Sequence, residues 1–375
     1  MSRSSVIQLT LFILTICTTT LAGAEWVTGK ALFFTGLSWS ELFSGLHYSI
    51  PFLFILTCHE FGHYLTARYY NIKVTLPYYI PLWLFGLPAI GTAGAYIRIK
   101  EEIQSRKEYF DVGVAGPLAG FVIALGVLYY GFTHLPEPEH IFTIHPEYEQ
   151  YGLDYADHVY QDENTLSITL GDNVIFYLFR KYLVEDPSLF PHPNEIIHYP
   201  YLFVGFLSLF WTALNLLPIG QLDGGHVVFG LIGERRSRIA SRVLFTAFLF
   251  YAGLGVVTPN MLQEGNADPM LTFGITLVAY LYYLYLCLYS MVESKRDRLM
   301  LASIILTAQF ATTLFFQVEG YTGWMLFALL LGRFLGVYHP PAADNRPLSK
   351  GRIVIGIISL IIFVLSFSPQ PLVIS

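Results

Sequence analysis

Three residues with the side chains of a metal centre stand close together in the first half of the chain. They are His59, Glu60 and His63, in the run Leu56-Thr-Cys-His-Glu-Phe-Gly-His. Histidines four residues apart share one face of a helix, so both imidazoles can bind one metal ion. A glutamate directly after the first histidine can reach water on that ion and act as a general base. The pattern predicts a zinc site with two histidine ligands and Glu60 as the base.

The surroundings of this motif decide between a metal site and a chance match. In a soluble chain, a bare HExxH pattern arises by chance about as often as it marks a metal site. Here the motif ends an apolar run at about 46–67. Ionisable groups in such a run are costly unless a cation or polar partners compensate them. Three of them within five residues favour a metal site.

A zinc site of this kind needs a third protein ligand and leaves one position for water. Between Glu195 and Glu234, the only carboxylate is Asp223, in Asn215-Leu-Leu-Pro-Ile-Gly-Gln-Leu-Asp-Gly-Gly. This motif ends another apolar run, just before a cluster of arginines, and His59 also lies near the cytoplasmic end of its run. Both motifs are expected in one layer of the membrane. Asp223 is therefore the predicted third ligand, for one zinc ion per chain.

The composition places these motifs in a membrane protein. Charged residues make up 13% of the 375 residues and hydrophobic residues 54%, whereas about a quarter of a soluble domain is charged. The expected fold is an all-α polytopic membrane protein with about nine transmembrane helices. The apolar runs lie at about 6–22, 46–67, 110–131, 200–219, 243–257, 270–291, 299–316, 322–338 and 353–368.

Lysines and arginines set the expected orientation. They gather within 98–107, 235–242, 295–298 and 346–352, and these loops alternate with loops that hold almost none. Threading nine spans in order puts all four basic loops on one side, which should be the cytoplasm. The predicted location is a bacterial inner (cytoplasmic) membrane, with the active site towards the cytoplasmic side. Residues 1–24 also have the outline of a cleavable signal peptide, but the length of their apolar run favours a retained helix.

Residues 72–99 cannot form one continuous helix, because three prolines interrupt them. The two ends, Val74–Tyr79 and Thr92–Ile99, have the pattern of short strands. Since both ends should face the cytoplasm, we expect a short re-entrant β-hairpin near the active site. Its edge could pair with an unwound substrate segment. Gly91 and Gly94 have no side chain to block that approach.

One sizeable segment lies outside the apolar runs, at residues 133–199. It holds twelve Asp or Glu, two basic residues and six of the eleven histidines. A solvated external loop is the simpler interpretation. A metal site or a pH sensor is the alternative, but no spacing of possible ligands in the segment supports it. The chain then divides into an N-terminal helix and external linker (1–45), a first catalytic part (46–131), an acidic extracytoplasmic loop (132–199), a second catalytic part (200–257) and a C-terminal four-helix membrane region (258–375).

Two separated motifs in this order resemble the site-2 protease family of intramembrane zinc metalloproteases. The resemblance covers about residues 46–230, and the chain lacks an evident PDZ domain. Its end, with His339-Pro-Pro341 and a last span, is similar to a cyanobacterial, plastid and bacterial branch of the family. The motifs that carry the resemblance are His59-Glu-Phe-Gly-His63, Asn215-x-x-Pro-x-x-x-x-Asp223-Gly-Gly, Gly91-Thr-Ala-Gly94-Ala and Gly116-Pro-Leu-Ala-Gly120.

The resemblance implies regulated intramembrane proteolysis, with zinc held by His59, His63 and Asp223 and with Glu60 as base. The expected partners are the lipid bilayer and a membrane-protein substrate with a transmembrane segment, and no basic run supports nucleic-acid binding. Asn215 could donate to the developing oxyanion, or it could satisfy backbone groups freed by the nearby proline.

Other interpretations remain open at this stage. A membrane metal or ion transporter would need further ionisable residues along other spans, which are nearly free of them. A catalytically silent scaffold would have lost the base or a ligand, and a different zinc protease class would need a glutamate ligand. Gly116 and Gly120 are interpreted as a helix-packing pair. His339 is interpreted as an interfacial residue.

Overall fold

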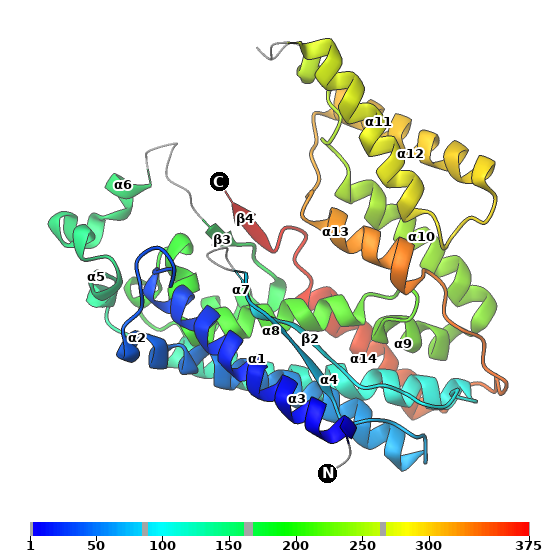
Figure 1. The fold of residues 1–375 in the computed structure, drawn as a ribbon, viewed down its shortest axis with the longest axis horizontal. Coiled ribbons are helices and arrows are strands. Elements are labelled where there is room, and N and C mark those ends of the chain that lie inside the picture. Colours follow the sequence, from blue (N-terminus) through cyan, green and yellow to red (C-terminus); the bar gives the residue numbers. More distant parts are fainter. Residues whose placement is uncertain (1–2, 85–88, 161–167, 263–267, 375) are drawn as a thin grey trace. The chain divides into compact units, whose positions relative to one another are not determined.

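The computed structural model describes residues 3–84, 89–160, 168–262 and 268–374. The chain forms two compact units. The first holds Met1–Ile103, Asp111–Leu216 and Ile357–Ser375, and the second holds Gln104–Phe110 and Leu217–Gly356. Helices predominate throughout the described residues (Figure 1).

Every one of the nine apolar runs contains a helix, but the described residues do not give nine spans. Five helical segments are long and apolar enough to cross a membrane: Arg3–Thr28, Trp39–Tyr69, Arg106–Thr133, Pro269–Cys287 and Lys295–Phe316. The predicted helical membrane fold is confirmed at this coarser level, and the count of nine is not. The helices of the nine runs are α1 Arg3–Thr28, α3 Leu46–Tyr69, α4 Arg106–Thr133, α8 Pro200–Leu216, α10 Glu234–Ala252, α11 Pro269–Cys287, α12 Lys295–Phe316, α13 Trp324–Leu329 continued by the π-helix η6 Leu330–Leu335, and α14 Lys350–Ser366.

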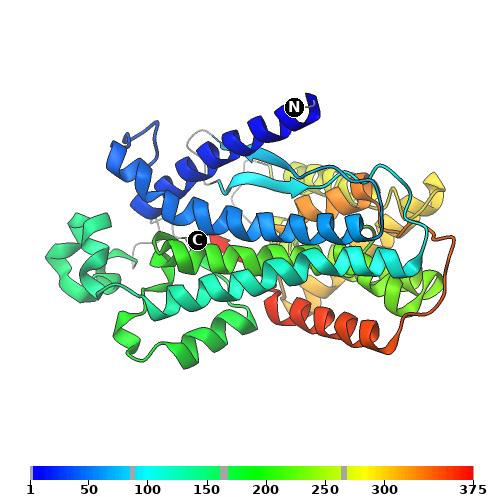
Figure 2. The same ribbon diagram turned by 90° about the horizontal axis from the view of Figure 1, so that it is seen from below.

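In the first unit, α3, α8 and the part of α4 from Asp111 onward lie side by side (Figure 2). Glycines let their backbones approach closely. A Cβ on Gly62 of α3 would lie 2.5 Å from the carbonyl oxygen of Ala115, and one on Gly205 of α8 would lie 2.6 Å from Leu128. Such contacts between small residues are the usual way to pack helices in a membrane. Lipid tails are as apolar as the helix surfaces, so the hydrophobic effect does not drive the helices together there.

The predicted hairpin is present, with its strands shifted from the expected bounds. Strands β1 Tyr78–Leu82 and β2 Gly91–Tyr96 pair antiparallel, with Tyr78 opposite Tyr96 and Leu82 opposite Gly91. The outer ends meet in a single bridge between Val74 and Ile99. Pro88, one of the three prolines that interrupt residues 72–99, lies outside the described residues. The hairpin lies against α1 (Figure 1).

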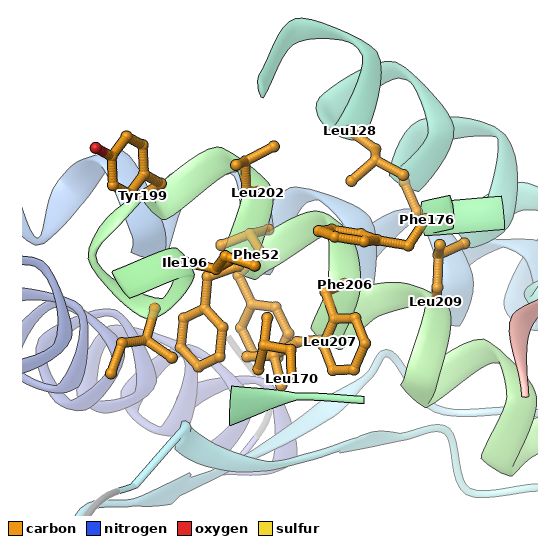
Figure 3. Close-up of a cluster of buried hydrophobic side chains, with 14 of the residues drawn as sticks. Phe52, Leu128, Leu170, Phe176, Ile196, Tyr199, Leu202, Phe206, Leu207 and Leu209 are labelled. Atoms are coloured by element: carbon orange, nitrogen blue, oxygen red, sulfur yellow. The ribbon is translucent and has the colours of Figure 1, made fainter. Parts of the chain in front are cut away.

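The described residues of the segment 133–199 form short helices and one three-residue strand, and the end of the segment is buried. Its last piece, η4, buries Glu195, Ile196, Ile197 and His198. Figure 3 shows Ile196 within the core cluster of this unit. The interpretation of the whole segment as a solvated loop is therefore wrong for η4. The elements are η1 Pro138–His140, α5 Ile141–Ile144, η2 Pro146–Asp154, α6 Ala156–Val159, β3 Ile168–Leu170, α7 Val174–Leu183, η3 Pro187–Leu189 and η4 Pro193–His198.

The remaining elements complete each unit. In the first, α2 Trp39–Ser44 precedes α3, and β3 pairs antiparallel with β4 Leu372–Ile374. In the second, α9 Asp223–Ile232 packs on α10, and η5 Pro259–Leu262 packs on α11. A buried hydrogen bond of 2.9 Å from the Tyr280 hydroxyl to Gln309 Oε1 joins α11 to α12, so these two polar side chains satisfy each other inside the helix pair.

Candidate metal and catalytic site

Helix α3 brings the HExxH side chains into a buried position. His59, Glu60 and His63 are 7%, 5% and 8% exposed. The two Nε2 atoms lie 3.0 Å apart, as expected for residues one turn apart on a single helical face. Two imidazole nitrogens this close can bind the same ion through bonds of about 2.0–2.1 Å.

A hydrogen bond to a carbonyl of the neighbouring helix orients the second imidazole. His63 Nδ1 lies 2.7 Å from the carbonyl oxygen of Val112 on α4. A carbonyl can only accept, so Nδ1 carries the proton and Nε2 keeps its lone pair. Histidines that bind metals are normally held in this way, with the second ring nitrogen donating to an oxygen. The donor set, its burial and this orientation fit zinc.

Two glycines of α4 leave the space that the imidazoles occupy. A Cβ on Gly116 would lie 2.2 Å from His63 Nε2, and a Cβ on Gly120 would lie 3.2 Å from His59 Cβ. The helix-packing interpretation of this pair is correct but incomplete, because the glycines also shape the site. The sequence held one signal for this role, since each pair has the same spacing of four residues.

Asn215, at the end of α8, lies beside the first histidine. Its Nδ2 is 3.5 Å from His59 Nε2. The amide therefore lies at the site, in addition to being close to the end of the helix. A small cavity opens next to His59, and most of its walls are apolar. The cavity is lined by Phe52, Ile55, Leu56, His59, Gly120, Ser208, Trp211 and Thr212.

The hairpin lies close to the base but is not open at Gly91. Tyr79 of β1 hydrogen-bonds through its hydroxyl to Thr57 Oγ1 at 2.8 Å, three residues before Glu60. Gly91 has φ +88° and its Cβ would lie 2.4 Å from Thr19 Cα of α1, so α1 covers this position. Gly94 has φ +102° and faces the edge of the Trp211 ring. Both positions require glycine for the backbone itself.

Asp223 belongs to the second unit, where it is the first residue of α9. A carboxylate in the first turn of a helix is stabilised by the positive end of the helix dipole. The turn before it is tight, with Gly220 at φ +61° and the backbone of Gly225 packed on Gly220. The motif therefore fixes the backbone that carries Asp223. Its role as third zinc ligand stays a prediction.

The second unit also holds a histidine pair that the sequence did not reveal. His339 Nε2 lies 2.7 Å from His226 Nδ1, and the His339 ring stacks on Phe229 at 3.9 Å between centroids. At 7% exposed, His339 is buried, so its interpretation as an interfacial residue is wrong. Burial, together with the neighbouring His226, lowers the pKa of His339 to about 3.

Comparisons with known proteins identify the family of this chain. Residues 47–258, more than half of the chain, match the model of peptidase family M50. The "Probable zinc metalloprotease EGY2, chloroplastic" of Oryza sativa subsp. indica is 30% identical over 229 residues, 58% of this chain and 36% of that protein. Its counterpart of the same name in Arabidopsis thaliana is 27% identical over 235 residues, 60% of this chain and 37% of that protein.

A further relative, "Probable zinc metalloprotease EGY1, chloroplastic" of Arabidopsis thaliana, is 28% identical over 180 residues, 48% of this chain and 28% of that protein. The chain thus spans about a third of the length of these curated relatives. No solved structure matches the chain. The names of these relatives describe them as chloroplastic, so they give no support to the predicted location in a bacterial inner membrane. Their names and the family imply zinc as the cofactor of a multi-pass membrane protein, and the chain belongs to peptidase family M50.

Proposed function

We propose that this chain is a membrane zinc endopeptidase that hydrolyses peptide bonds within or beside transmembrane segments of other proteins. The observation that carries the proposal is the buried cluster of His59, Glu60 and His63, with both Nε2 atoms on one side of α3. A carboxyl and two imidazoles gathered at this depth are costly to bury, and a bound cation compensates them.

In this proposal His59, His63 and Asp223 hold the zinc ion. Zinc, when bound, acidifies water and withdraws electrons from a carbonyl oxygen. Glu60 accepts the proton of the attacking water and delivers it to the leaving amine. Asn215, whose amide lies 3.5 Å from His59 Nε2, donates to the oxygen on which negative charge develops. The burial of the base keeps bulk water from competing for the proton.

A helical substrate must unwind before its carbonyls can react, because they are already hydrogen-bonded. The β1–β2 hairpin is a two-stranded sheet, and a free strand edge can pair with an extended peptide. Gly94 remains a candidate for this contact. Gly91 is a poor test of it, since a side chain there would meet Thr19 of α1 and disturb packing whatever the substrate does. The proposed orientation keeps the active site towards the cytoplasmic side.

The proposal is tested by separating zinc binding from cleavage. Glu60→Gln removes the base without changing the shape of the side chain, so we expect unchanged zinc content and a loss of proteolysis of at least 100-fold. Zinc is measured by mass spectrometry of the purified protein, and cleavage on a co-expressed single-span substrate. An exposed carboxylate, Glu149→Gln, is the matched control. Cleavage that persists in Glu60→Gln would remove the assigned base.

The predicted third ligand has its own test. Asp223→Asn should weaken zinc binding by at least tenfold, because the amide is a far poorer zinc ligand than the carboxylate. Unchanged affinity would refute the assignment of Asp223. The competing transporter interpretation is not favoured, because the family and the curated relatives are proteases.

A further inference from the structure

Three side chains of the segment 133–199 converge at a place well away from the HExxH motif. They are His145, between α5 and η2, and Glu195 and His198 of η4. His145 Nε2 lies 3.4 Å from His198 Nε2 and 3.8 Å from Glu195 Oε2, and His198 Nε2 lies 3.6 Å from the same oxygen. Each residue offers one ligand atom to a common point.

The glutamate oxygen at this point lacks a partner. Glu195 is 1% exposed, and its Oε2 makes no hydrogen bond among the described residues. The other oxygen, Oε1, accepts a hydrogen bond from the Tyr160 hydroxyl. A buried acceptor without a partner is costly and demands an explanation. Because separations of 3.6 and 3.8 Å exceed a hydrogen bond, the two imidazoles do not provide it.

Both histidine rings are oriented as metal ligands are. His198 Nδ1 lies 2.5 Å from the carbonyl oxygen of Trp26, and His145 Nδ1 lies 3.2 Å from Glu147 Oε1. These oxygens can only accept, so each Nδ1 carries the proton and each Nε2 turns its lone pair inward. A backbone carbonyl and a carboxylate are the usual outer partners of metal-bound histidines. Burial lowers the pKa of His198 to about 4, so its ring is neutral near pH 7.

The spacing of the three ligand atoms suits a small transition-metal ion. A point equidistant from them lies about 2.1 Å from each, given their separations, and bonds from zinc to nitrogen or carboxylate oxygen are about 2.0–2.2 Å. Two histidines and one carboxylate are a common zinc donor set. The His145 side chain is 23% exposed, which leaves a way in for the ion and for water in a fourth position.

This place is separate from the HExxH site. Glu195 and His198 directly precede α8, whereas Asn215, which neighbours His59, is at the other end of that helix. The 15 residue steps from Pro200 to Asn215 correspond to about 22 Å of helix. One ion cannot serve both groups of ligands.

From this geometry we infer that His145, Glu195 and His198 form a second zinc site, outside the catalytic centre. The ion compensates the buried Glu195 carboxylate and ties three parts of the chain together, namely the α5–η2 junction, η4 and, through the His198–Trp26 hydrogen bond, the end of α1. By the predicted threading these parts face away from the cytoplasm. We assign the site a structural role, because its ligands belong to packed segments of the chain and do not line an open cleft.

The test uses full-length protein in detergent and counts zinc atoms per chain. His59→Ala/His63→Ala removes the HExxH ligands, and we expect this background to retain one zinc ion where the wild type holds two. Adding Glu195→Gln, which keeps the shape and the Tyr160 hydrogen bond, should weaken the remaining zinc at least tenfold and abolish the rise in melting temperature that zinc causes. His158→Ala, an exposed histidine of the same segment, is the control and should change neither.

The two sites can fail independently in this design. If the HExxH motif bound no zinc, wild type and background would hold equal amounts, and the effect of Glu195→Gln on the remaining ion would still decide the inference. A background protein without zinc, or one whose zinc and melting temperature survive both Glu195→Gln and His198→Ala, would overturn it. Melting temperatures measured with a chelator confirm that each variant is folded.

Discussion

Gly116→Ala adds one methyl group at the point where α4 faces the HExxH helix. The new Cβ would lie 2.2 Å from His63 Nε2 and 2.5 Å from Cδ2 and Cε1, whereas ordinary contacts begin at 3.4 Å. The ring must therefore move by about 1 Å or more, since α3 and α4 are already in close contact at Gly62 and Ala115. Metal–ligand distances tolerate only about 0.2 Å. The imidazole cannot satisfy the methyl group and a zinc ion together.

The loss of zinc affinity depends on how much the added methyl group disturbs the metal-free protein and how much it disturbs the zinc-bound protein. Without metal, the His63 ring can rotate away, at the cost of its hydrogen bond to Val112, which is worth about 1 kcal/mol. In the zinc-bound state, a rotated ring no longer presents the Nε2 lone pair to the ion. We expect zinc affinity to fall about 100-fold, or ~2.7 kcal/mol, and proteolysis to fall with it. Zinc affinity is measured by competition with a chelator of known affinity.

The same helix supplies the control. Gly126 has no heavy atom within 4 Å of the position its Cβ would take, so Gly126→Ala adds the same methyl group to α4 without a clash. It should leave zinc binding and cleavage unchanged and raise stability by up to about 1 kcal/mol. Wild-type zinc affinity in Gly116→Ala would refute the argument. So would an equal loss of affinity in Gly126→Ala.

Three further outcomes are expected. Asn215→Ala should lower kcat by about 10²–10³-fold and change KM little, as for other oxyanion donors, and a change in KM alone would contradict that role. Gly94→Val should reduce cleavage without changing zinc content, and because the positive φ of Gly94 disfavours any side chain, an equal loss in Gly94→Ala would attribute the effect to the backbone and not to substrate contact. Because burial holds the pKa of His339 to about 3, the native ring stays neutral while the unfolded chain takes up a proton below pH 6.5. Stability should fall by about 1.4 kcal/mol between pH 7.5 and 5.5, and His339→Gln, compared by thermal unfolding, should remove this slope.

The parts of the fold that depend on local chemistry could be read from the sequence. The four-residue spacing of His59 and His63 places them on one face of any helix, and the structure has their nitrogens 3.0 Å apart. The prolines of residues 72–99 exclude a continuous helix, and the structure has a hairpin there. Apolar runs predicted helices, but α8 and α13 are too short to be identified as spans by length, so the number of crossings does not follow from hydropathy.

The parts that depend on packing could not be read in this way. Gly116 is 53 positions from His63 in the sequence, and only the contact of α3 with α4 gives it a role in shaping the site. Similarly, His145 and His198 are 53 positions apart, and irregular short helices join them. No periodicity in the sequence relates such residues. The sequence therefore predicted a solvated loop for the histidine-rich segment, whereas its η4 end lies in the core.

At each of the two proposed zinc sites, another element of the fold fixes the ring orientation of one histidine. His63 and His198 both donate from Nδ1 to a backbone carbonyl of a neighbouring element, Val112 in one case and Trp26 in the other. Each therefore presents Nε2 to further ligand atoms. His134, the residue after α4, also has Nδ1 near a carbonyl, but this carbonyl belongs to Tyr130, four residues earlier in the chain, and the two rings stack. An acceptor on another element fixes a ring relative to the rest of the fold, whereas a nearby acceptor, as for His134 and His145, fixes it only relative to its own segment. A change that displaces the Val112 or the Trp26 carbonyl should therefore weaken zinc binding at the corresponding proposed site, whereas the loss of the Tyr130 contact should not.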